Sequence, residues 1–416
     1  MSPTAIVPHQ LPFINLPHIT RIGHDILPPA MRTHMQQVKS QQLKVNQSGL
    51  LAPIQHLFNY SVNTSKGFVG QAQMLWDSFR YSRHVKQLKK SYTQDLPADK
   101  LVRLVYDANG HPKLPPDAKL ELAEEGVVPH NQTSQVPEAN DAYNNAGFVF
   151  DFFKEHLGVN ISQPLVQVVN FNDDILNTGY QNAFYTPMML GAHLVIYGKG
   201  DDKLFNSPAS SIEIVGHEFT HFYLDQMYGE KFFYQGQSGA INEHLADVVG
   251  MSIKAKHEGL DGNNYSDEFW HMGANWMIEP GMGIRHMLHP GTAYSHSEYG
   301  KDSQPAHMKD FDITPYDQGG VHINSGILNR VFALFANSVN SPLHDLPLKI
   351  WLRAAQTVGA QPDFREFAEA LVLSARELDQ YPNTKGLDLE KKILAACKKT
   401  GVLDYVVRGK QMVKAP

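Results

Sequence analysis

The chain has 416 residues, too many for one small core and typical of a protein with two or three lobes. Hydrophobic residues make up 42% and charged residues 19%, which excludes a disordered or fibrous chain and indicates an ordinary globular protein. The single cysteine, Cys397, excludes an internal disulfide and a cysteine-based zinc site. Its apolar neighbours predict a buried packing role.

The N-terminal 27 residues contain no basic stretch followed by an apolar one, because prolines interrupt every candidate for a signal peptide. No run of 18 apolar residues occurs in the sequence, so no transmembrane helix and no membrane partner are predicted. We therefore expect a protein that is cytoplasmic or is exported without a recognisable signal peptide.

Charge is distributed unevenly along the chain. Residues 1–100 hold 11 Lys and Arg against 4 acidic residues, whereas the remainder holds 25 basic and 38 acidic residues. The positive residues are scattered and form no nucleic-acid-binding motif, so no nucleic-acid partner is expected. The simpler interpretation is a basic N-terminal segment that packs on the acidic remainder of the same chain.

In chain order, a Pro- and Gln-rich stretch comes first, and an amphipathic pattern follows over residues 67–90. Alternating or continuous apolar runs then predict short strands, while the helical period dominates after residue 210. The strands expected are 101–106, 165–169 and 193–197. The helices expected are 141–157, 211–228, 239–258, 324–339, 342–358, 363–376 and 388–399.

The expected helix 211–228 contains the pattern H-E-x-x-H at His217-Glu218-Phe219-Thr220-His221. Histidines four positions apart lie about 40° apart around a helix and about 6 Å apart along it, so both imidazoles can reach one metal ion. Glu218 lies beside them, where a carboxylate can accept a proton. So short a pattern also occurs by chance on solvated helix faces, and a catalytic zinc ion requires a third protein ligand.

Glu243, in the next expected helix, is the best candidate for that third ligand. Its neighbours are apolar, and an unpaired carboxylate in such surroundings would be costly. Asp247 follows one turn later on the same face, where it can orient a ligating imidazole. His244 is a competing ligand, but its position points it about 100° away from Glu243.

Three separated motifs resemble the thermolysin family of neutral zinc endopeptidases: HEFTH at 217–221, GAINE at 239–243 and DQGGVHINSG at 317–326. Looser similarity extends from about Tyr106 to the C-terminus and is closest to the leaderless, protealysin-like branch. The resemblance implies an α+β zincin fold with two lobes. These are a mixed, β-rich N-terminal lobe and a mainly helical C-terminal lobe, with a central zinc-binding helix.

The resemblance also implies domains and an activity. Residues 1–98 would be a basic pro-segment or accessory region, 99–230 the N-terminal catalytic lobe with the H-E-x-x-H helix, and 231–416 the helical C-terminal lobe. The protein would be made as a zymogen whose N-terminal segment packs on its own catalytic unit. It would cleave peptides or proteins before bulky hydrophobic residues, with Zn²⁺ as its cofactor.

The resemblance also implies roles for individual residues of this sequence. His217, His221 and Glu243 would bind zinc, and Glu218 would be the general base. A zinc hydrolase needs this set because the metal polarises the scissile carbonyl while the carboxylate transfers the proton.

Further roles implied by the resemblance surround these four residues. Asp247 and Asn242 would hold the ligating histidines in place. His322, oriented by Asp317, would donate to the oxyanion, and Tyr234 would be a second donor. Each such donor contributes about 3 kcal/mol in comparable sites.

The resemblance also implies residues that bind the substrate, along an edge strand, at the carbonyl beyond the cleaved bond, and in an apolar specificity pocket. These residues are Asn182, Ala183, Arg285, Ile214, Met272 and Ile284. An apolar pocket discriminates by only about 1–3 kcal/mol per methylene, so a broad preference is expected.

One departure concerns calcium, which members of the family often hold beside the active-site helices. Glu213 keeps an acidic residue four positions before His217, but Lys254 stands where a bridging glutamate is expected. Residues 270–274 also lack the expected carboxylates. Because an ammonium group can offset Glu213, we expect no calcium at this position.

Two alternatives to an endopeptidase remain open. A zinc aminopeptidase would need an acidic group that clamps a free amine, and no motif for one is found. A non-catalytic partner-binding protein with a zinc-stabilised fold would not need Glu218, Tyr234 and His322, all of which are present.

Overall fold

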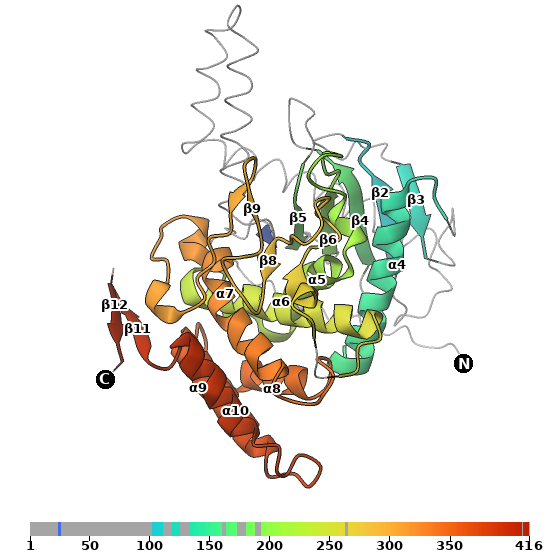
Figure 1. The fold of residues 1–416 in the computed structure, drawn as a ribbon. Helices are drawn as coiled ribbons and strands as arrows, with labels where there is room; N and C mark the ends of the chain where they lie inside the picture. The colour runs from blue at the N-terminus through green and yellow to red at the C-terminus, as the bar shows by residue number, and fades with distance from the viewer. Residues whose placement is uncertain are drawn as a thin grey trace, which may run out of the picture.

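The computed structural model describes residues 24–25, 102–110, 119–124, 133–159, 164–172, 180–187, 193–262, 265–409 and 411–415. One lobe is built on a six-stranded sheet in the order β1-β5-β6-β4-β2-β3 (Figure 1). The strands are β1 (His24–Asp25), β2 (Val102–Asp107), β3 (Lys119–Ala123), β4 (Pro164–Phe171), β5 (Ala183–Pro187) and β6 (His193–Gly198). β2, β4 and β6 are parallel, and β1, β3 and β5 pair antiparallel with their neighbours.

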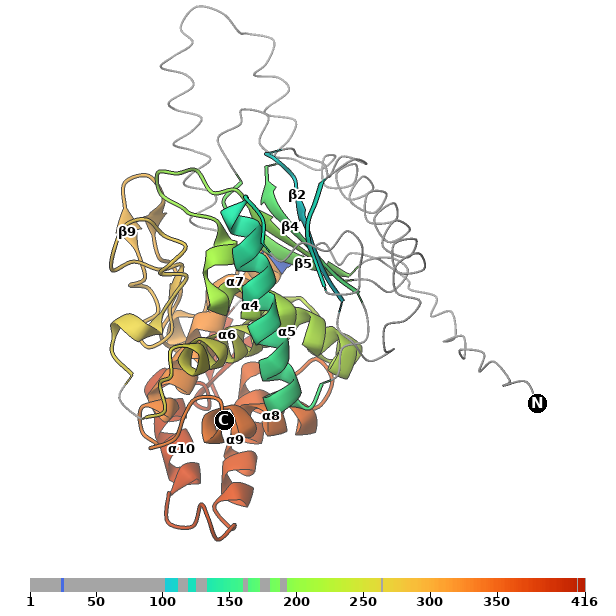
Figure 2. The ribbon, with the colours of Figure 1, turned by 90° about the vertical axis from the view of Figure 1, so that its right-hand side faces the viewer.

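The parallel strands are apolar on both faces because both faces are buried. In β4, Leu165 and Val169 join the main core, whereas Val166 and Val168 join a second, smaller apolar cluster. This alternation follows from the two-residue period of a strand. Helix α4 (Pro137–Phe152) packs on the face that belongs to the main core (Figure 2).

Two long helices, α5 (Ile212–Tyr228) and α6 (Gly236–His257), pack against each other in the centre of the molecule (Figure 1). They approach closely because glycines face each other at the contact. A Cβ on Gly250 would lie 2.5 Å from the carbonyl oxygen of Glu213, and one on Gly216 would lie 2.7 Å from Ile253. This close packing brings the first half of α6 beside the middle of α5, where the H-E-x-x-H motif lies.

The C-terminal lobe is helical and packs on α6. Its helices are α7 (Asp317–Ala336), α8 (Leu346–Thr357), α9 (Phe364–Leu378) and α10 (Leu389–Thr400). The segment between α6 and α7 holds the paired strands β7 (His271–Met272) with β8 (Arg285–His286), and β9 (Ser295–His296) with β10 (Gly300–Lys301). A hairpin of β11 (Tyr405–Arg408) and β12 (Gln411–Lys414) closes the chain.

The short helices complete the element order: η1 (Phe153–Leu157), η2 (Pro208–Ser210), η3 (Gly229–Phe232), η4 (Glu268–Trp270) and η5 (Met308–Asp310). The expected strands and helices are confirmed at their centres, and Cys397 is buried as predicted. The helix expected over 141–157 begins earlier, at Pro137, and its last five residues form the π-helix η1. The amphipathic stretch 67–90 lies outside the described residues.

The sequence analysis did not predict β3 or the C-terminal hairpin, whose strands are only four or five residues long. Among the helices that the structure describes, none is long and apolar enough to cross a bilayer.

Candidate active site

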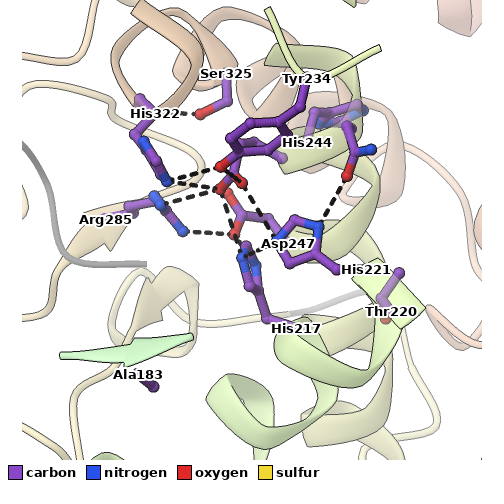
Figure 3. A network of polar contacts seen from close by, with 12 residues as sticks. Ala183, His217, Thr220, His221, Tyr234, His244, Asp247, Arg285, His322 and Ser325 are labelled. Carbon is purple, nitrogen blue, oxygen red and sulfur yellow. Dashed lines mark hydrogen bonds and ion pairs between the residues drawn. The ribbon is translucent and has the colours of Figure 1, made fainter. Parts of the chain in front are cut away.

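The three predicted metal ligands converge at the contact between α5 and α6. His217, His221 and Glu243 are completely buried, and one ligating atom from each lies within 4.8 Å of the other two. The Nε2 atoms of the two imidazoles face each other at 3.0 Å (Figure 3). The Glu243 carboxylate closes the group, with Oε1 3.3 Å from Nε2 of His221 and Oε2 3.5 Å from Nε2 of His217.

The other ring nitrogens of the two histidines lie against oxygen atoms. Nδ1 of His221 is 2.8 Å from Oδ1 of Asn242, and Nδ1 of His217 is 2.8 Å from Oδ1 of Asp247. These oxygens accept, so they favour the tautomer with the proton on Nδ1. Both Nε2 lone pairs then point at one place that also faces Glu243. Two imidazoles and a carboxylate around a common point are a donor set that suits zinc.

The charges around this point favour a cation. Burial alone would lower the pKa of His217, but its contacts with Asp247 and Glu243 outweigh burial and raise that pKa to about 9. Burial would raise the pKa of Glu243, yet the neighbouring His322 and His221 hold it well below its ordinary value. The surroundings that favour a proton here also favour a metal cation in its place.

A second group of side chains, from the loop before α6 and from α7, surrounds the same carboxylate. Tyr234, in the loop before α6, donates its hydroxyl hydrogen to Glu243, and its Oη lies 3.1 Å from Nε2 of His322. Oδ1 of Asp317 lies 2.6 Å from Nδ1 of His322, and Oδ2 accepts from the backbone N–H of His322 at 2.9 Å. The structure therefore brings Tyr234, His322 and Asp317 together with the predicted ligands. Figure 3 shows Tyr234 and His322 beside His217 and His221.

A left-handed turn explains how Asp317 reaches His322 from only five residues away. The backbone φ angles are 55° at Asp317, 46° at Gln318, 86° at Gly319 and 79° at Gly320. Regular helical geometry therefore begins only after Gly320, although hydrogen bonding of the helical type starts at Asp317. Glycine suits this turn, because a Cβ on Gly319 would lie 3.1 Å from the backbone of Gly236 at the start of α6.

Arg285, the predicted ligand of a substrate carbonyl, lies in β8 and is completely buried. Its guanidinium places one nitrogen 2.8 Å from Oδ1 of Asp247 and another 3.4 Å from Oε2 of Glu243. Burial would raise the pKa of Asp247, but the charge of Arg285 and the contact with His217 together outweigh burial and lower that pKa. In this structure Arg285 joins the two carboxylates of α6 (Figure 3).

The predicted base and the predicted substrate strand lie on the sheet side of the site. Glu218 is buried on α5, and burial together with the charge of Glu218 raises the pKa of Tyr197 in β6 well above its ordinary value. Ala183 begins β5 and pairs with Tyr197, while the carbonyl of Asn182 accepts from the backbone N–H of Gly198 at 2.8 Å. Figure 3 shows Ala183 set apart from the polar network.

The three predicted pocket residues, Ile214, Met272 and Ile284, are completely buried. Met272 and Ile284 are neighbours, since the backbone N–H of Ile284 donates to the carbonyl of Met272 at 2.8 Å. All three belong to the main apolar core, and Arg285 directly follows Ile284 in the chain.

At the position expected to lack calcium, Lys254 points its ammonium group at backbone oxygens. Nζ donates to the carbonyls of Phe269 and His271, each at 3.2 Å, and lies 5.2 Å from the ring centroid of Phe269. The nearby Glu213 accepts from the backbone N–H of Gly273 at 3.0 Å.

His244, the competing candidate for a metal ligand, points away from His217, His221 and Glu243. Its Nδ1 lies 2.7 Å from Oδ1 of Asn329, and its Nε2 accepts from the indole N–H of Trp351 at 2.7 Å. Sequence reasoning missed Asn329 and Trp351. They lie 85 and 107 residues from His244 and belong to no spacing pattern.

Comparison with known proteins agrees with this geometry. The model for the thermolysin metallopeptidase catalytic domain matches residues 85–224, and the model for the thermolysin metallopeptidase alpha-helical domain matches residues 230–402. An extracellular metalloprotease of Pectobacterium carotovorum is 34% identical over 306 residues, which cover 70% of this chain and 82% of the relative. The chain belongs to the thermolysin family.

Other members of the thermolysin family support a protealysin-like architecture. Protease PrtS of Photorhabdus is 30% identical over 318 residues, covering 74% of this chain and 78% of the relative. The solved precursor of protealysin, a metalloproteinase from Serratia proteamaculans, superimposes with a TM-score of 0.66 at 26% identity. It covers 91% of this chain and 99% of its own. The protein is therefore a zinc-dependent metalloendopeptidase with the expected α+β, two-lobed zincin fold.

Proposed function

We propose that His217, His221 and Glu243 are the zinc ligands of this metalloendopeptidase. The observation that carries this assignment is the convergence of their ligating atoms within 4.8 Å in a fully buried position. Asp247 and Asn242 hold the two imidazoles by their Nδ1 atoms, at 2.8 Å each. When bound, zinc supplies the Lewis acidity that polarises the scissile carbonyl and makes a water molecule more acidic.

Glu218 acts as the general base in this proposal. It lies next to His217 on the same helix, so its carboxylate is placed beside the ligands but is not needed as one of them. It takes a proton from the attacking water and later passes it to the leaving amine. Burial strengthens its electrostatic interactions, because bulk water does not screen them.

His322 and Tyr234 stabilise the negative charge that develops on the carbonyl oxygen of the substrate. Their polar atoms lie 3.1 Å apart, so both can reach one oxygen atom. Asp317 keeps the His322 ring in position through its 2.6 Å contact with Nδ1. Removal of one such donor costs about 3 kcal/mol in comparable sites.

We further propose that the substrate lies along β5 and is cleaved before a bulky apolar residue. Asn182 precedes β5 and Ala183 begins it, and β5 would be the edge strand of the catalytic unit without β1. The buried apolar residues Ile214, Met272 and Ile284 would form the specificity pocket. Arg285 directly follows Ile284 and carries the charge that would meet a substrate carbonyl.

The N-terminal region, residues 1–98, is proposed to be a pro-segment of a zymogen. Its described strand β1 pairs antiparallel with β5, with His24 opposite Tyr185 and Asp25 opposite Phe184. The N-terminal region thus takes up hydrogen-bonding positions on the strand proposed for substrate. The similar solved structure is itself a precursor. We place the catalytic lobes at 99–230 and 231–416.

The relative from Pectobacterium is named an extracellular metalloprotease, and we propose that this chain too is exported. Fractionation of the natural host tests this directly. Activity found only in the cytoplasm would contradict export.

The test of the activity is cleavage of an internally quenched peptide with both ends blocked, with and without a chelator. Endopeptidase activity that the chelator abolishes and added zinc restores is expected. A series of peptides with Leu, Phe, Ala or Asp after the cleaved bond measures specificity, and faster cleavage before Leu and Phe is predicted. Activity only on peptides with a free N-terminus would indicate an aminopeptidase. A protein that binds zinc without any cleavage would be the partner-binding alternative.

A further inference from the structure

A buried series of hydrogen bonds runs from Trp351 in the C-terminal lobe to Asp247, which lies against the proposed metal ligand His217. The indole N–H of Trp351 in α8 donates to Nε2 of His244 in α6 at 2.7 Å. Nδ1 of His244 lies 2.7 Å from Oδ1 of Asn329 in α7, whose Nδ2 donates to Oδ2 of Asp247 at 2.7 Å. Oδ1 of Asp247 is 2.8 Å from Nδ1 of His217. All five side chains are at most 1% exposed.

The chemistry of the end groups determines which atom donates and which accepts at each hydrogen bond of this series. An indole nitrogen can only donate, so Nε2 of His244 must accept and the proton of a neutral ring is on Nδ1. That proton is donated to the Asn329 oxygen, which turns the Asn329 NH₂ group toward Asp247. A carboxylate accepts at both oxygens. Every link from Trp351 to Asp247 therefore has one donor and one acceptor, and reversal of any link would place two donors or two acceptors together.

The Asp247 carboxylate is held from three sides as a result. Asn329 binds Oδ2, while Arg285 and His217 both lie 2.8 Å from Oδ1. Arg285 alone would leave the carboxylate free to rotate about its own axis, and Asn329 prevents that rotation by binding the second oxygen. The orientation of the His217 ring therefore depends on residues that do not touch it.

We propose that His244, with Trp351 and Asn329, is a positioning unit that fixes Asp247 and through it the metal-binding tautomer of His217. The inference rests on the proposed role of His217 as a zinc ligand. Hydrogen-bonded partners behind a ligand typically affect metal affinity by 10–100-fold when removed. His244 acts two links further out, so we expect an effect of about tenfold, at the lower end of this range.

The experiment measures zinc release from the full-length, zinc-loaded protein into an excess of a fluorescent chelator. His244→Leu and Trp351→Phe interrupt the series of hydrogen bonds at two places. His244→Gln keeps one acceptor and one donor at its position. Trp276→Phe is the matched control. Trp276 is also fully buried, and its indole nitrogen has no hydrogen-bond partner within the described part of the chain. Cobalt-substituted samples of the same variants report ligand geometry through their visible absorption spectra.

The proposal predicts that His244→Leu and Trp351→Phe release zinc about tenfold faster than Trp276→Phe and shift the cobalt spectrum, with His244→Gln close to wild type. Release from Trp351→Phe no faster than from Trp276→Phe, with an unchanged cobalt spectrum, would overturn it. The comparison of Trp351→Phe with Trp276→Phe tests the proposal even if His244→Leu does not fold. Wild-type protein that binds no zinc would instead refute the ligand assignment itself.

Discussion

Asp317 holds His322 at two points, through Nδ1 of the ring at 2.6 Å and through the backbone N–H at 2.9 Å. A carboxylate that binds both the ring and the main chain of one residue fixes the position of that ring. Because Nδ1 donates to Asp317, the ring donates to an oxyanion from Nε2 in its doubly protonated form, which the carboxylate stabilises. The left-handed turn from Asp317 to Gly320 makes this double contact possible. The oxyanion donor of the proposed mechanism is therefore set before substrate arrives.

Replacement of Asp317 by Asn should lower kcat about tenfold with little change in KM, because the ring loses its charged partner but remains in place. His322→Ala should lower kcat further, by about 10²–10³-fold, since the donor itself is lost. Steady-state kinetics on a blocked peptide measures both. Equal, wild-type kcat values for the two variants would show that His322 does not act on the oxyanion.

The Glu218→Gln variant should be inactive while it keeps its zinc, because the amide cannot accept the proton yet leaves the proposed ligands intact. Metal analysis of the same sample that is used for kinetics separates catalysis from metal binding. Near-normal peptide turnover by Glu218→Gln would rule out its assignment as the base.

Calcium should neither bind near Lys254 nor raise the melting temperature. The ammonium group already donates to two backbone oxygens there, at 3.2 Å each, and a divalent cation would have to displace it. Thermal melts and titration calorimetry with and without calcium test this. Lys254→Met should be destabilised by roughly 1–3 kcal/mol, because two buried carbonyls lose their donor. Tight calcium binding by the unaltered chain that is lost in Glu213→Gln would contradict the prediction.

Stability should fall as the pH decreases below about 6.5, and His286 should be one cause. Burial first, and then the neighbouring His271, lower the pKa of His286 to about 4. Above pH 6.5 the ring is neutral in both states, whereas between 6.5 and 4 only the unfolded chain takes up the proton. The cost therefore grows over that window to about 3 kcal/mol.

The free energy of unfolding, measured at pH 7 and at pH 5, gives the loss of stability between these two pH values. His286→Gln should lose less stability between the two values than wild type does. The exposed His289 in the same cluster provides the control, because His289→Gln keeps the buried ring of His286 and leaves the proposed zinc ligands unchanged. An identical loss in all three proteins would show that His286 does not contribute.

The pairing of β1 with β5 predicts that the full-length chain is less active than its processed form. Incubation of the purified chain should shorten it and raise its activity. Replacement of both His24 and Asp25 by proline removes the backbone N–H groups of β1 and should raise the initial rate of the uncleaved chain. Alanine replacements at the same two positions keep these N–H groups and are the matched control. An uncleaved wild-type chain that is already fully active would contradict the pro-segment.

The helical periods and the H-E-x-x-H motif could be predicted from the sequence because they are local. The i, i+4 spacing of His217 and His221 alone places both rings on one side of α5. The place of Glu243 could be inferred only because α6 follows α5 after a short loop.

Other features depend on contacts between distant segments and leave no pattern in the sequence. Arg285 was expected to face substrate, but whether its guanidinium also binds Asp247 and Glu243 depends on where β8 lies relative to α6. The left-handed turn before His322 was indicated only by the pair Gly319-Gly320. The non-glycine residues in it, Asp317 and Gln318, carry no such signal.

The most direct test of the central claim is the zinc content of purified wild type and Glu243→Ala, with folding checked by circular dichroism. The proposed ligand set predicts one zinc per wild-type chain, and almost none in a folded Glu243→Ala chain because two imidazoles alone bind zinc weakly. One firmly bound zinc in folded Glu243→Ala would show that the metal is held elsewhere and would contradict the account.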